Sequence, residues 1–364
     1  MSARVEIPDF CMAVVMGPTD AALPLMTRWF AEPEIVPDRD AAHDRLSMRA
    51  FAATHLPDDR RAARGAWVAT ARRLHAPPVA LVVAPWAEGV PLRRLRHLRP
   101  QAERTLLRLP KEGFAAVHRI GPGTAIRRAS LPCDRRGEAG PFDIVGDVHG
   151  HAVSLRNLLT ELGYRVRDDG ADPPPGRRAV FVGDLVDRGP ASPDVMRLAM
   201  GMCRDGAALC VLGNHDRKLA RSLAGRIEGD RRTMGQMGAR DPAFRSETKD
   251  FIETRPDHLW LAGGDLVVVH AAIRPEMIGR SSKALTGFAL HGPTTGRQDE
   301  WGHPIRLDWV ADHPGRPTVV HGHVPVAAPA WRNGVLDIDT GCGMGGRLSA
   351  LRWPEGEIVS VREA

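Results

Sequence analysis

Three short polar motifs in the middle of the chain carry side chains that commonly bind metal ions. They are Gly-Asp-Val-His-Gly at residues 146–150, Gly-Asp-Leu-Val-Asp-Arg-Gly at 183–189 and Gly-Asn-His-Asp at 213–216. Each follows an apolar run typical of a buried strand, so its polar groups are expected on the loop after that strand. Open α/β sheets build their sites at such loops. Oxygen and imidazole ligands gathered from several loops favour a pair of divalent transition-metal ions over a structural zinc.

In this order the motifs resemble those of the calcineurin-like metallophosphoesterases, within their phosphoprotein-phosphatase branch. Two later segments complete the resemblance: Val-Val-Val-His-Ala, which contains His270, and His-Gly-His-Val-Pro, which contains His323. A single Gly-Asp pair is usually a turn, but five motifs in the family's order are specific. The resemblance covers residues 141–364. It implies a metal-dependent phosphoric ester hydrolase with an α/β fold, in which a β-sandwich is flanked by helices.

The same resemblance implies a set of metal ligands. Two divalent ions are expected, with Mn²⁺ as the first choice and Ni²⁺, Co²⁺, Fe²⁺ or Mg²⁺ as alternatives. The ligands would be Asp147 and His149 at the first ion, Asp184 between the two ions, and Asn214, His270 and His323 at the second.

Other residues of these motifs would act on the substrate. His215 would protonate the leaving oxygen, and Asp187 would orient its imidazole and raise its basicity. The planar guanidinium of Arg188 would bind two phosphoryl oxygens, and Arg306 is the candidate for a second phosphate-binding arginine. For Asp339 two interpretations stand side by side: it orients a ligand or the acid, or it caps a turn between strands.

Length and composition suit a water-soluble protein of two domains. The chain has 364 residues, which is more than one core usually supports. No apolar stretch approaches the roughly 20 residues that span a bilayer, and the N-terminus lacks a signal-peptide core. The five cysteines are scattered and form no Cys-x-x-Cys pair. We therefore expect a cytoplasmic protein with reduced cysteines and no membrane segment.

The excess of basic over acidic residues is confined to the N-terminal part of the chain. Residues 1–140 contain 22 Lys and Arg against 15 Asp and Glu, whereas residues 141–364 contain 28 against 29. The excess is densest at residues 91–100, a run rich in arginine. Such a run is suited to follow a nucleic-acid phosphate backbone, and it is equally compatible with a solvated, arginine-rich helix.

The segment 13–24 has the strand, loop and helix pattern of a phosphate-binding P-loop without its functional residues. The motif would require Gly, Lys and Ser or Thr where this chain has Ala22, Leu23 and Pro24. The lysine that contacts phosphates and the hydroxyl that binds magnesium are missing, so we expect no kinase activity.

Domain order and local sequence resemble the bacterial polynucleotide kinase-phosphatases, in which a P-loop kinase precedes a phosphoesterase. The resemblance is carried by Gly-Pro-Thr at 17–19 and, more closely, by the lead-in at 134–150. We expect a smaller, degenerate α/β P-loop-kinase-like domain over residues 1–120, a Gly- and Pro-rich linker over 121–140, and the metallophosphoesterase domain over 141–364.

Three functional hypotheses follow. The first is hydrolysis of phosphates on nucleotides or on RNA or DNA ends, with a phosphorylated nucleotide or nucleic acid as partner. The second keeps the chemistry and changes the substrate, giving a diadenosine tetraphosphatase or a protein serine/threonine phosphatase. The third is a nucleic-acid-binding protein whose catalytic centre has decayed.

Overall fold

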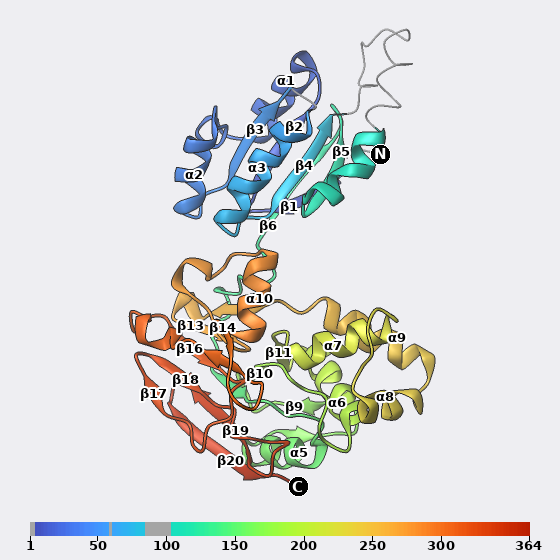
Figure 1. Ribbon diagram of the computed structural model, residues 1–364, viewed down its shortest axis with the longest axis vertical. Coiled ribbons are helices and arrows are strands. Elements are labelled where there is room, and N and C mark those ends of the chain that lie inside the picture. Colours follow the sequence, from blue (N-terminus) through green and yellow to red (C-terminus); the bar gives the residue numbers. More distant parts are fainter. Residues whose placement is uncertain (1–3, 58–59, 84–102) are drawn as a thin grey trace. The chain divides into compact units, whose positions relative to one another are not determined.

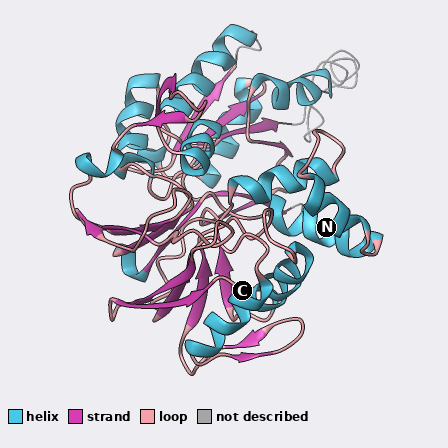
Figure 2. Ribbon diagram, turned by 60° about the horizontal axis from the view of Figure 1, so that its bottom comes forward, coloured by secondary structure: helices cyan, strands magenta, loops and turns pink. Residues whose placement is uncertain are grey.

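The protein is described by a computed structural model that covers residues 4–57, 60–83 and 103–364 (Figure 1). The arginine-rich run at 91–100 lies outside these residues. The chain divides into two compact units: unit 1 is Met1–Leu131 with Arg280–Ala284, and unit 2 is Pro132–Gly279 with Leu285–Ala364. Both units contain helices and strands (Figure 2). Among the described helices, none is long and apolar enough to cross a bilayer.

Unit 1 is built on a parallel sheet of four strands in the order β3-β2-β4-β5. Its two inner strands, β2 and β4, are apolar and fully buried, as expected for parallel strands covered on both faces. A separate pair joins β1 to β6 in parallel. The elements are β1 (Arg4–Pro8), β2 (Met12–Met16), α1 (Thr19–Trp29), α2 (Arg39–Ser47), β3 (Ala52–Leu56), α3 (Arg61–Arg73), β4 (Pro78–Val83), β5 (Ala116–Ile120) and β6 (Ala125–Ala129), and residues 103–112 are helical.

Part of the segment expected to be a linker is a strand. Gly121 and Thr124 close a turn, since the Thr124 amide donates to the Gly121 carbonyl at 2.9 Å and the Gly121 amide donates to the Thr124 hydroxyl at 3.0 Å. The following residues, Ala125–Ala129, then pair with β1. Gly and Pro at 121–123 therefore mark a turn between two strands, and the unit boundary lies near Leu131.

The P-loop pattern of unit 1 is not matched by a P-loop in the structure. Only Gly17 and Pro18 separate β2 from α1, which begins at Thr19 and contains Pro24 in its interior. A phosphate-cradling loop is several residues longer, because its successive amides must surround the phosphate. The kinase-like character expected for this unit is therefore not confirmed, although the strand-loop-helix order is present.

Unit 2 contains two five-stranded sheets. One has the order β11-β10-β7-β19-β20 and the other has the order β12-β13-β16-β18-β17. The strands are β7 (Phe142–Val145), β10 (Arg178–Phe181), β11 (Ala208–Cys210), β12 (His258–Leu261), β13 (Leu266–Val269), β16 (Thr318–His321), β17 (Trp331–Arg332), β18 (Val335–Asp337), β19 (Arg347–Trp353) and β20 (Glu357–Arg362). Two small antiparallel pairs are added, β8 (Arg165–Val166) with β9 (Ala171–Asp172) and β14 (Thr294–Gln298) with β15 (Pro304–Arg306).

The apolar side chains of unit 2 form layers between and outside these sheets. One cluster joins the inner faces of both, for example Ile144 and Val180 of the first sheet with Leu266 and Val320 of the second. Helices cover the outer face of the first sheet, and α10 covers that of the second. The expected β-sandwich flanked by helices is thus observed. The helices are α5 (Ala152–Glu161), α6 (Ser192–Arg204), α7 (Asn214–Leu223), α8 (Arg231–Gly238), α9 (Pro242–Glu253) and α10 (Lys283–His291).

Candidate metal centre

The motif residues lie on loops that follow parallel strands of both sheets. Strands β7, β10 and β11 run parallel in the first sheet, as do β13, β16 and β18 in the second. Their carboxyl ends therefore meet at one edge of each sheet. The loop after β7 carries Asp147 and His149, that after β10 carries Asp184, and α7 begins at Asn214 after β11. His270 directly follows β13, and His323 comes two residues after the end of β16.

Asp184 is the common member of two groups of ligand atoms. One group is His149, Asp184 and His215, and the other is Asp184, His270 and His323; within each group the atoms lie within 4.8 Å of one another. The Asp184 Oδ2 lies 3.8 Å from the Nε2 atom of His149 and 3.4 Å from that of His270. Two groups of possible ligands that share a carboxylate are compatible with a pair of metal ions.

The loops that carry these residues have unusual backbone conformations. Within the described chain, nine non-glycine residues have positive φ, and five of them are His149, Asp184, Asp187, Arg188 and His323. Such conformations cost free energy and collect at functional sites, where the surrounding structure enforces them.

Glycines let two of these loops meet at close range. A Cβ atom on Gly183, whose φ is +95°, would lie 2.6 Å from the Gly213 amide nitrogen. Glycine is therefore required where the β10 loop crosses the β11 loop. This crossing brings the His215 amide to the Asp184 Oδ1 atom at 2.9 Å, at the N-terminal end of α7.

The surroundings of His270 are well suited to a cation. Its Nδ1 faces the Val182 carbonyl oxygen at 3.1 Å, and its Nε2 faces the Asn214 Oδ1 at 2.8 Å as well as the Asp184 carboxylate. A neutral imidazole has one N–H and cannot satisfy acceptors on both sides. Burial lowers the pKa of His270 to about 3, so the ring does not acquire a second proton at neutral pH. A metal ion at Nε2 would satisfy every group.

The buried carboxylates are a second, independent indication that this site suits a cation. The Asp147 Oδ1 atom is buried without a hydrogen-bond partner, and its Oδ2 accepts from the His323 amide at 3.2 Å. Burial, followed by the charges of Asp339 and Asp184, raises the pKa of Asp147 well above its usual range. Negative groups gathered in this way need a compensating cation. The donor set therefore fits divalent metal ions.

The imidazoles are held in the form that binds metal. The His149 Nδ1 atom lies 3.0 Å from the Val186 carbonyl oxygen, which fixes the proton there and leaves Nε2 as a ligand. Burial lowers the pKa of His149 to about 4 and that of His323 to about 3. Both rings are thus neutral near pH 7. The Nε2 atom of His323 lies 2.9 Å from the Arg306 guanidinium, so a metal ion bound through Nε2 would take the place of this contact.

His215 differs from these rings because its surroundings raise its pKa. Its Nδ1 atom lies 2.7 Å from the Asp187 carboxylate. Burial lowers its pKa, but the hydrogen bond to Asp187 and the charge of Asp184 outweigh burial and raise it overall. Although its ring belongs to the first of the two groups, His215 is therefore better suited than His149 to hold a proton there. This is the property required of an acid that protonates a leaving oxygen.

The structure gives the three remaining candidates different environments. Arg188 is exposed beside His149 and His215, whose proton affinities its charge reduces. Arg306 lies at the other group, bound to His323 and donating to the His291 carbonyl at 2.7 Å. Asp339 is buried and caps a turn by accepting from the Gly341 amide at 3.0 Å. Its charge nevertheless acts on Asp147, so both interpretations of Asp339 have a physical basis.

Two residues near the centre were missed in the sequence. Asp216 is buried and accepts from the Leu185 amide at 2.9 Å, which ties the third motif to the second; burial raises its pKa to about 7. Its place as the last residue of Gly-Asn-His-Asp was the available signal. His291 lies at the end of α10, with its ring 6.4 Å from that of His323. No sequence pattern marks it.

Comparison with known proteins identifies the family. Residues 140–343 match the calcineurin-like phosphoesterases. The bis(5'-nucleosyl)-tetraphosphatase PrpE (asymmetrical) of Anoxybacillus flavithermus is 39% identical over 228 residues, which are 60% of this chain and 93% of the relative. The protein of that name in Halalkalibacterium halodurans is 40% identical with the same coverage.

A crystal structure described as that of a candidate diadenosine tetraphosphatase aligns with 64% of this chain and 97% of its own, with a TM-score of 0.47 and 25% identity. The match to residues 140–343 includes all three central motifs together with His270 and His323. The chain therefore belongs to the calcineurin-like phosphoesterase family and is a metal-dependent phosphoric ester hydrolase.

Proposed function

We propose that the two ligand groups sharing Asp184 hold two divalent ions. The ligands would be Asp147, His149, Asp184, Asn214, His270 and His323, and we keep Mn²⁺ as the first choice. Bound there, the ions would neutralise phosphoryl charge and make a water acidic enough to attack phosphorus. The observation that carries this proposal is the arrangement around His270, where oxygen acceptors face both nitrogens of a ring too buried to be charged.

The substrate we favour is a dinucleoside tetraphosphate. Relatives about 40% identical, each covered over 93% of its length, are bis(5'-nucleosyl)-tetraphosphatases of the asymmetrical type. We infer that water attacks one end of the tetraphosphate bridge, releasing a nucleoside triphosphate and a nucleoside monophosphate. This proposal corresponds to the second of the three hypotheses drawn from the sequence. Membership of a hydrolase family gives no support to the decayed-centre hypothesis.

The polar residues beside the metal ligands have separable tasks in this reaction. His215, held by Asp187, would donate its proton to the departing oxygen. Arg188 and Arg306 would bind phosphoryl oxygens from opposite groups, because guanidinium forks fit such oxygens in pairs. Asp216 would keep the second and third motif loops in register through the Leu185 amide.

A second candidate substrate, a phosphorylated polynucleotide end, is favoured by a feature of unit 1. A cavity of about 550 Å³ there is lined by Arg61, Arg64, Arg108, Lys111 and Glu112. Arg64 forms a two-point ion pair with Glu112, at 2.7 and 2.8 Å, and both side chains are nearly buried. The carboxylate is thereby neutralised and the other three cations are left to face solvent. Such a lining suits a chain of phosphates. We propose that unit 1, as a degenerate kinase-like domain, binds phosphate without transferring it.

One substrate panel separates these candidates. The purified chain with Mn²⁺ should cleave diadenosine tetraphosphate to triphosphate and monophosphate, and faster than it releases phosphate from a 3′-phosphorylated oligonucleotide or a phosphopeptide. Removal of metal by a chelator should abolish all of these activities, and Mn²⁺ should restore them. Faster dephosphorylation of the oligonucleotide would select the second candidate. Full activity after chelation would contradict the metal centre itself.

A further inference from the structure

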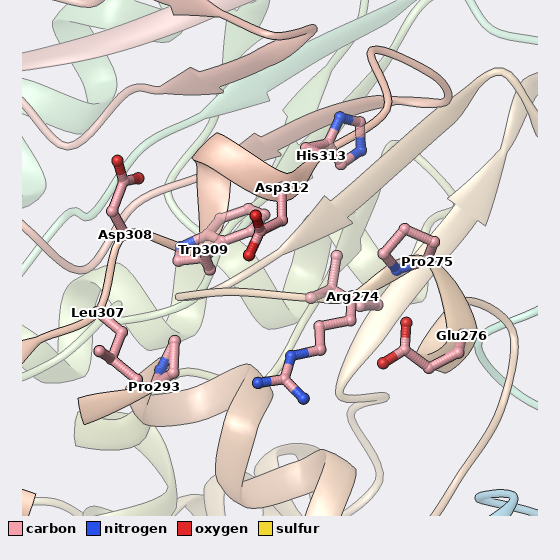
Figure 3. Close-up of a pocket in the computed structure, with 10 residues that line it drawn as sticks. Arg274, Pro275, Glu276, Pro293, Leu307, Asp308, Trp309, Asp312 and His313 are labelled. Carbon is pink, nitrogen blue, oxygen red and sulfur yellow. The ribbon is translucent and has the colours of Figure 1, made fainter. Parts of the chain in front are cut away.

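Unit 2 contains a cavity of about 520 Å³ that the proposed metal centre does not use (Figure 3). Its wall is made by the loop after His270, by Pro293, and by the segment from Leu307 to His313. Its volume falls within the range of sites that hold small organic ligands, roughly 300–1,000 Å³. Most of the lining side chains are exposed, so the cavity is open to ligands from solvent.

The wall of this cavity begins one residue beyond Arg306. Arg306 contacts His323 at 2.9 Å and the His291 carbonyl at 2.7 Å. The next residue, Leu307, lines the cavity and donates its amide to the carbonyl of Pro293, another lining residue, at 3.0 Å. Consecutive Cα atoms are about 3.8 Å apart. The Arg306 guanidinium is thus held at the His291 carbonyl, two residues along the chain from the lining residue Pro293.

Two flat groups are held in place in the wall. The Trp309 ring packs edge-on against His321, with centroids 5.3 Å apart, and remains partly exposed. The Arg274 guanidinium lies over the Phe288 ring at 4.9 Å. An indole and a guanidinium plane both attract the π-face of a heteroaromatic ring. Because each is already fixed by a neighbour, little conformational entropy is lost when a ring stacks there.

The same wall carries two carboxylates, Glu276 and Asp312, to which no residue within the described ranges donates a hydrogen bond. Figure 3 shows the Glu276 carboxylate turned toward the side of Arg274 and the Asp312 carboxylate beside Trp309. Both side chains are exposed, and in the described chain neither forms an ion pair with Arg274. Ionised carboxylates can only accept hydrogen bonds, so they select ligands that offer N–H groups.

These observations point to a nucleobase that carries an exocyclic amine, such as adenine or guanine. We propose that this cavity binds the base of the nucleotide whose phosphate lies at Arg306, with Trp309 as the stacking surface and Glu276 and Asp312 as acceptors for the amine. The inference rests on the proposed action on nucleotide substrates and adds to it the subsite that recognises the base.

The experiment compares substrates with and without a base in the Trp309→Ala variant. Diadenosine tetraphosphate carries the base, and an aryl phosphate lacks it. Loss of one stacked base should lower kcat/KM for the tetraphosphate by about 5- to 150-fold, chiefly through KM, while the aryl phosphate reports on folding and the metal centre. Trp309→Phe should restore most of the loss. The matched control is Trp331→Ala, since Trp331 is 49% exposed in the same unit and does not line the cavity.

A second variant tests recognition of the amine and does not depend on the packing of Trp309. Glu276→Gln should lower kcat/KM for diadenosine tetraphosphate more than for diuridine tetraphosphate, because uracil has no exocyclic amine. Either of two results would overturn the base subsite alone. One is an equal decrease of kcat/KM for the adenine and uracil substrates in Glu276→Gln, and the other is a Trp309→Ala variant that still prefers diadenosine tetraphosphate over the aryl phosphate. A wild-type protein that prefers no nucleotide substrate over the aryl phosphate would instead overturn the proposed function, and the subsite with it.

Discussion

Both units place loops and helices after buried parallel strands, yet the two units carry different functional side chains. In unit 2 the residues after the strands are carboxylates and imidazoles, with Asp184 shared between two ligand groups. In unit 1 the connection from β2 to α1 offers only Gly17 and Pro18 before the helix begins. The charged cavity of unit 1 lies instead beside α3 and the helical residues 103–112, and it is lined mainly by cations. The residues that follow the strands thus carry metal-binding side chains in unit 2, whereas the charged residues of unit 1 lie on its helices.

The largest expected effect concerns the shared carboxylate. Asp184→Ala removes an anionic ligand from both groups at once, whereas Asn214→Ala removes a neutral ligand from one. We expect Asp184→Ala to lower kcat by more than about 100-fold, and by more than Asn214→Ala does. Even residues that only support metal ligands change metal affinity or activity by about 10- to 100-fold when they are replaced. Bound metal is measured by elemental analysis alongside the rate.

The matched control for this change lies in unit 1. Asp20→Ala removes an exposed carboxylate from the first turn of α1 and should leave hydrolysis unchanged. If Asp20→Ala abolished hydrolysis while Asp184→Ala retained it, the assignment of chemistry to unit 2 would be wrong.

The second effect depends on the leaving group. If His215 donates a proton to the departing oxygen, His215→Ala should lower kcat/KM for an alkyl phosphate by about 10²–10⁴-fold and affect a nitrophenyl phosphate far less. A nitrophenolate leaves readily without a proton. Arg188→Ala should weaken both substrates alike, since both present the same phosphoryl oxygens. An unchanged alkyl-to-aryl ratio in His215→Ala, with metal content intact, would exclude His215 as the acid.

A smaller effect is expected from the cavity of unit 1. Each phosphate contact to a single strand contributes about 0.7 to the slope of log affinity against log salt concentration. The Arg61→Gln, Lys111→Gln double variant should therefore reduce that slope for a single-stranded oligonucleotide by about 1.4. Arg39→Gln serves as a control, because this exposed arginine of α2 lies outside the cavity. Equal slopes for the double variant and the wild type would show that the cavity does not contact nucleic acid.

For the last prediction we expect no detectable kinase activity. Incubation with γ-labelled ATP and an oligonucleotide with a 5′-hydroxyl end should yield no labelled oligonucleotide, since Leu23 and Pro24 stand where a kinase needs lysine and a hydroxyl. The assay should include Asp184→Ala, so that the protein's own hydrolase cannot remove the label. Label transferred by this variant would mean that unit 1 catalyses a reaction of its own.

The sequence by itself determined the family and the candidate ligands. Each motif follows an apolar run: the Gly-Asp motifs, Gly-Asn-His-Asp and the two later histidine motifs. Where parallel strands lie in one sheet, their carboxyl ends bring the residues that follow them together. The local signal was sufficient because each motif specifies both a strand end and the side chains after it. The sequence pattern behind the linker expected at 121–140 was less specific, because Gly and Pro mark a turn equally well between domains and between paired strands.

Only the tertiary structure decided how these residues act on one another. Three of these interactions join residues that lie 28 to 88 positions apart in the sequence. They are the contact of Asp187 with His215, the contact of His270 with the Val182 carbonyl, and the hydrogen bond by which Asp216 holds the second motif loop. The cavity beside Arg306 is likewise assembled from three separate segments, none of which carries a motif. Sequence patterns report the local preference of the chain, whereas proton affinity and base recognition arise from burial and from neighbours that only folding brings together.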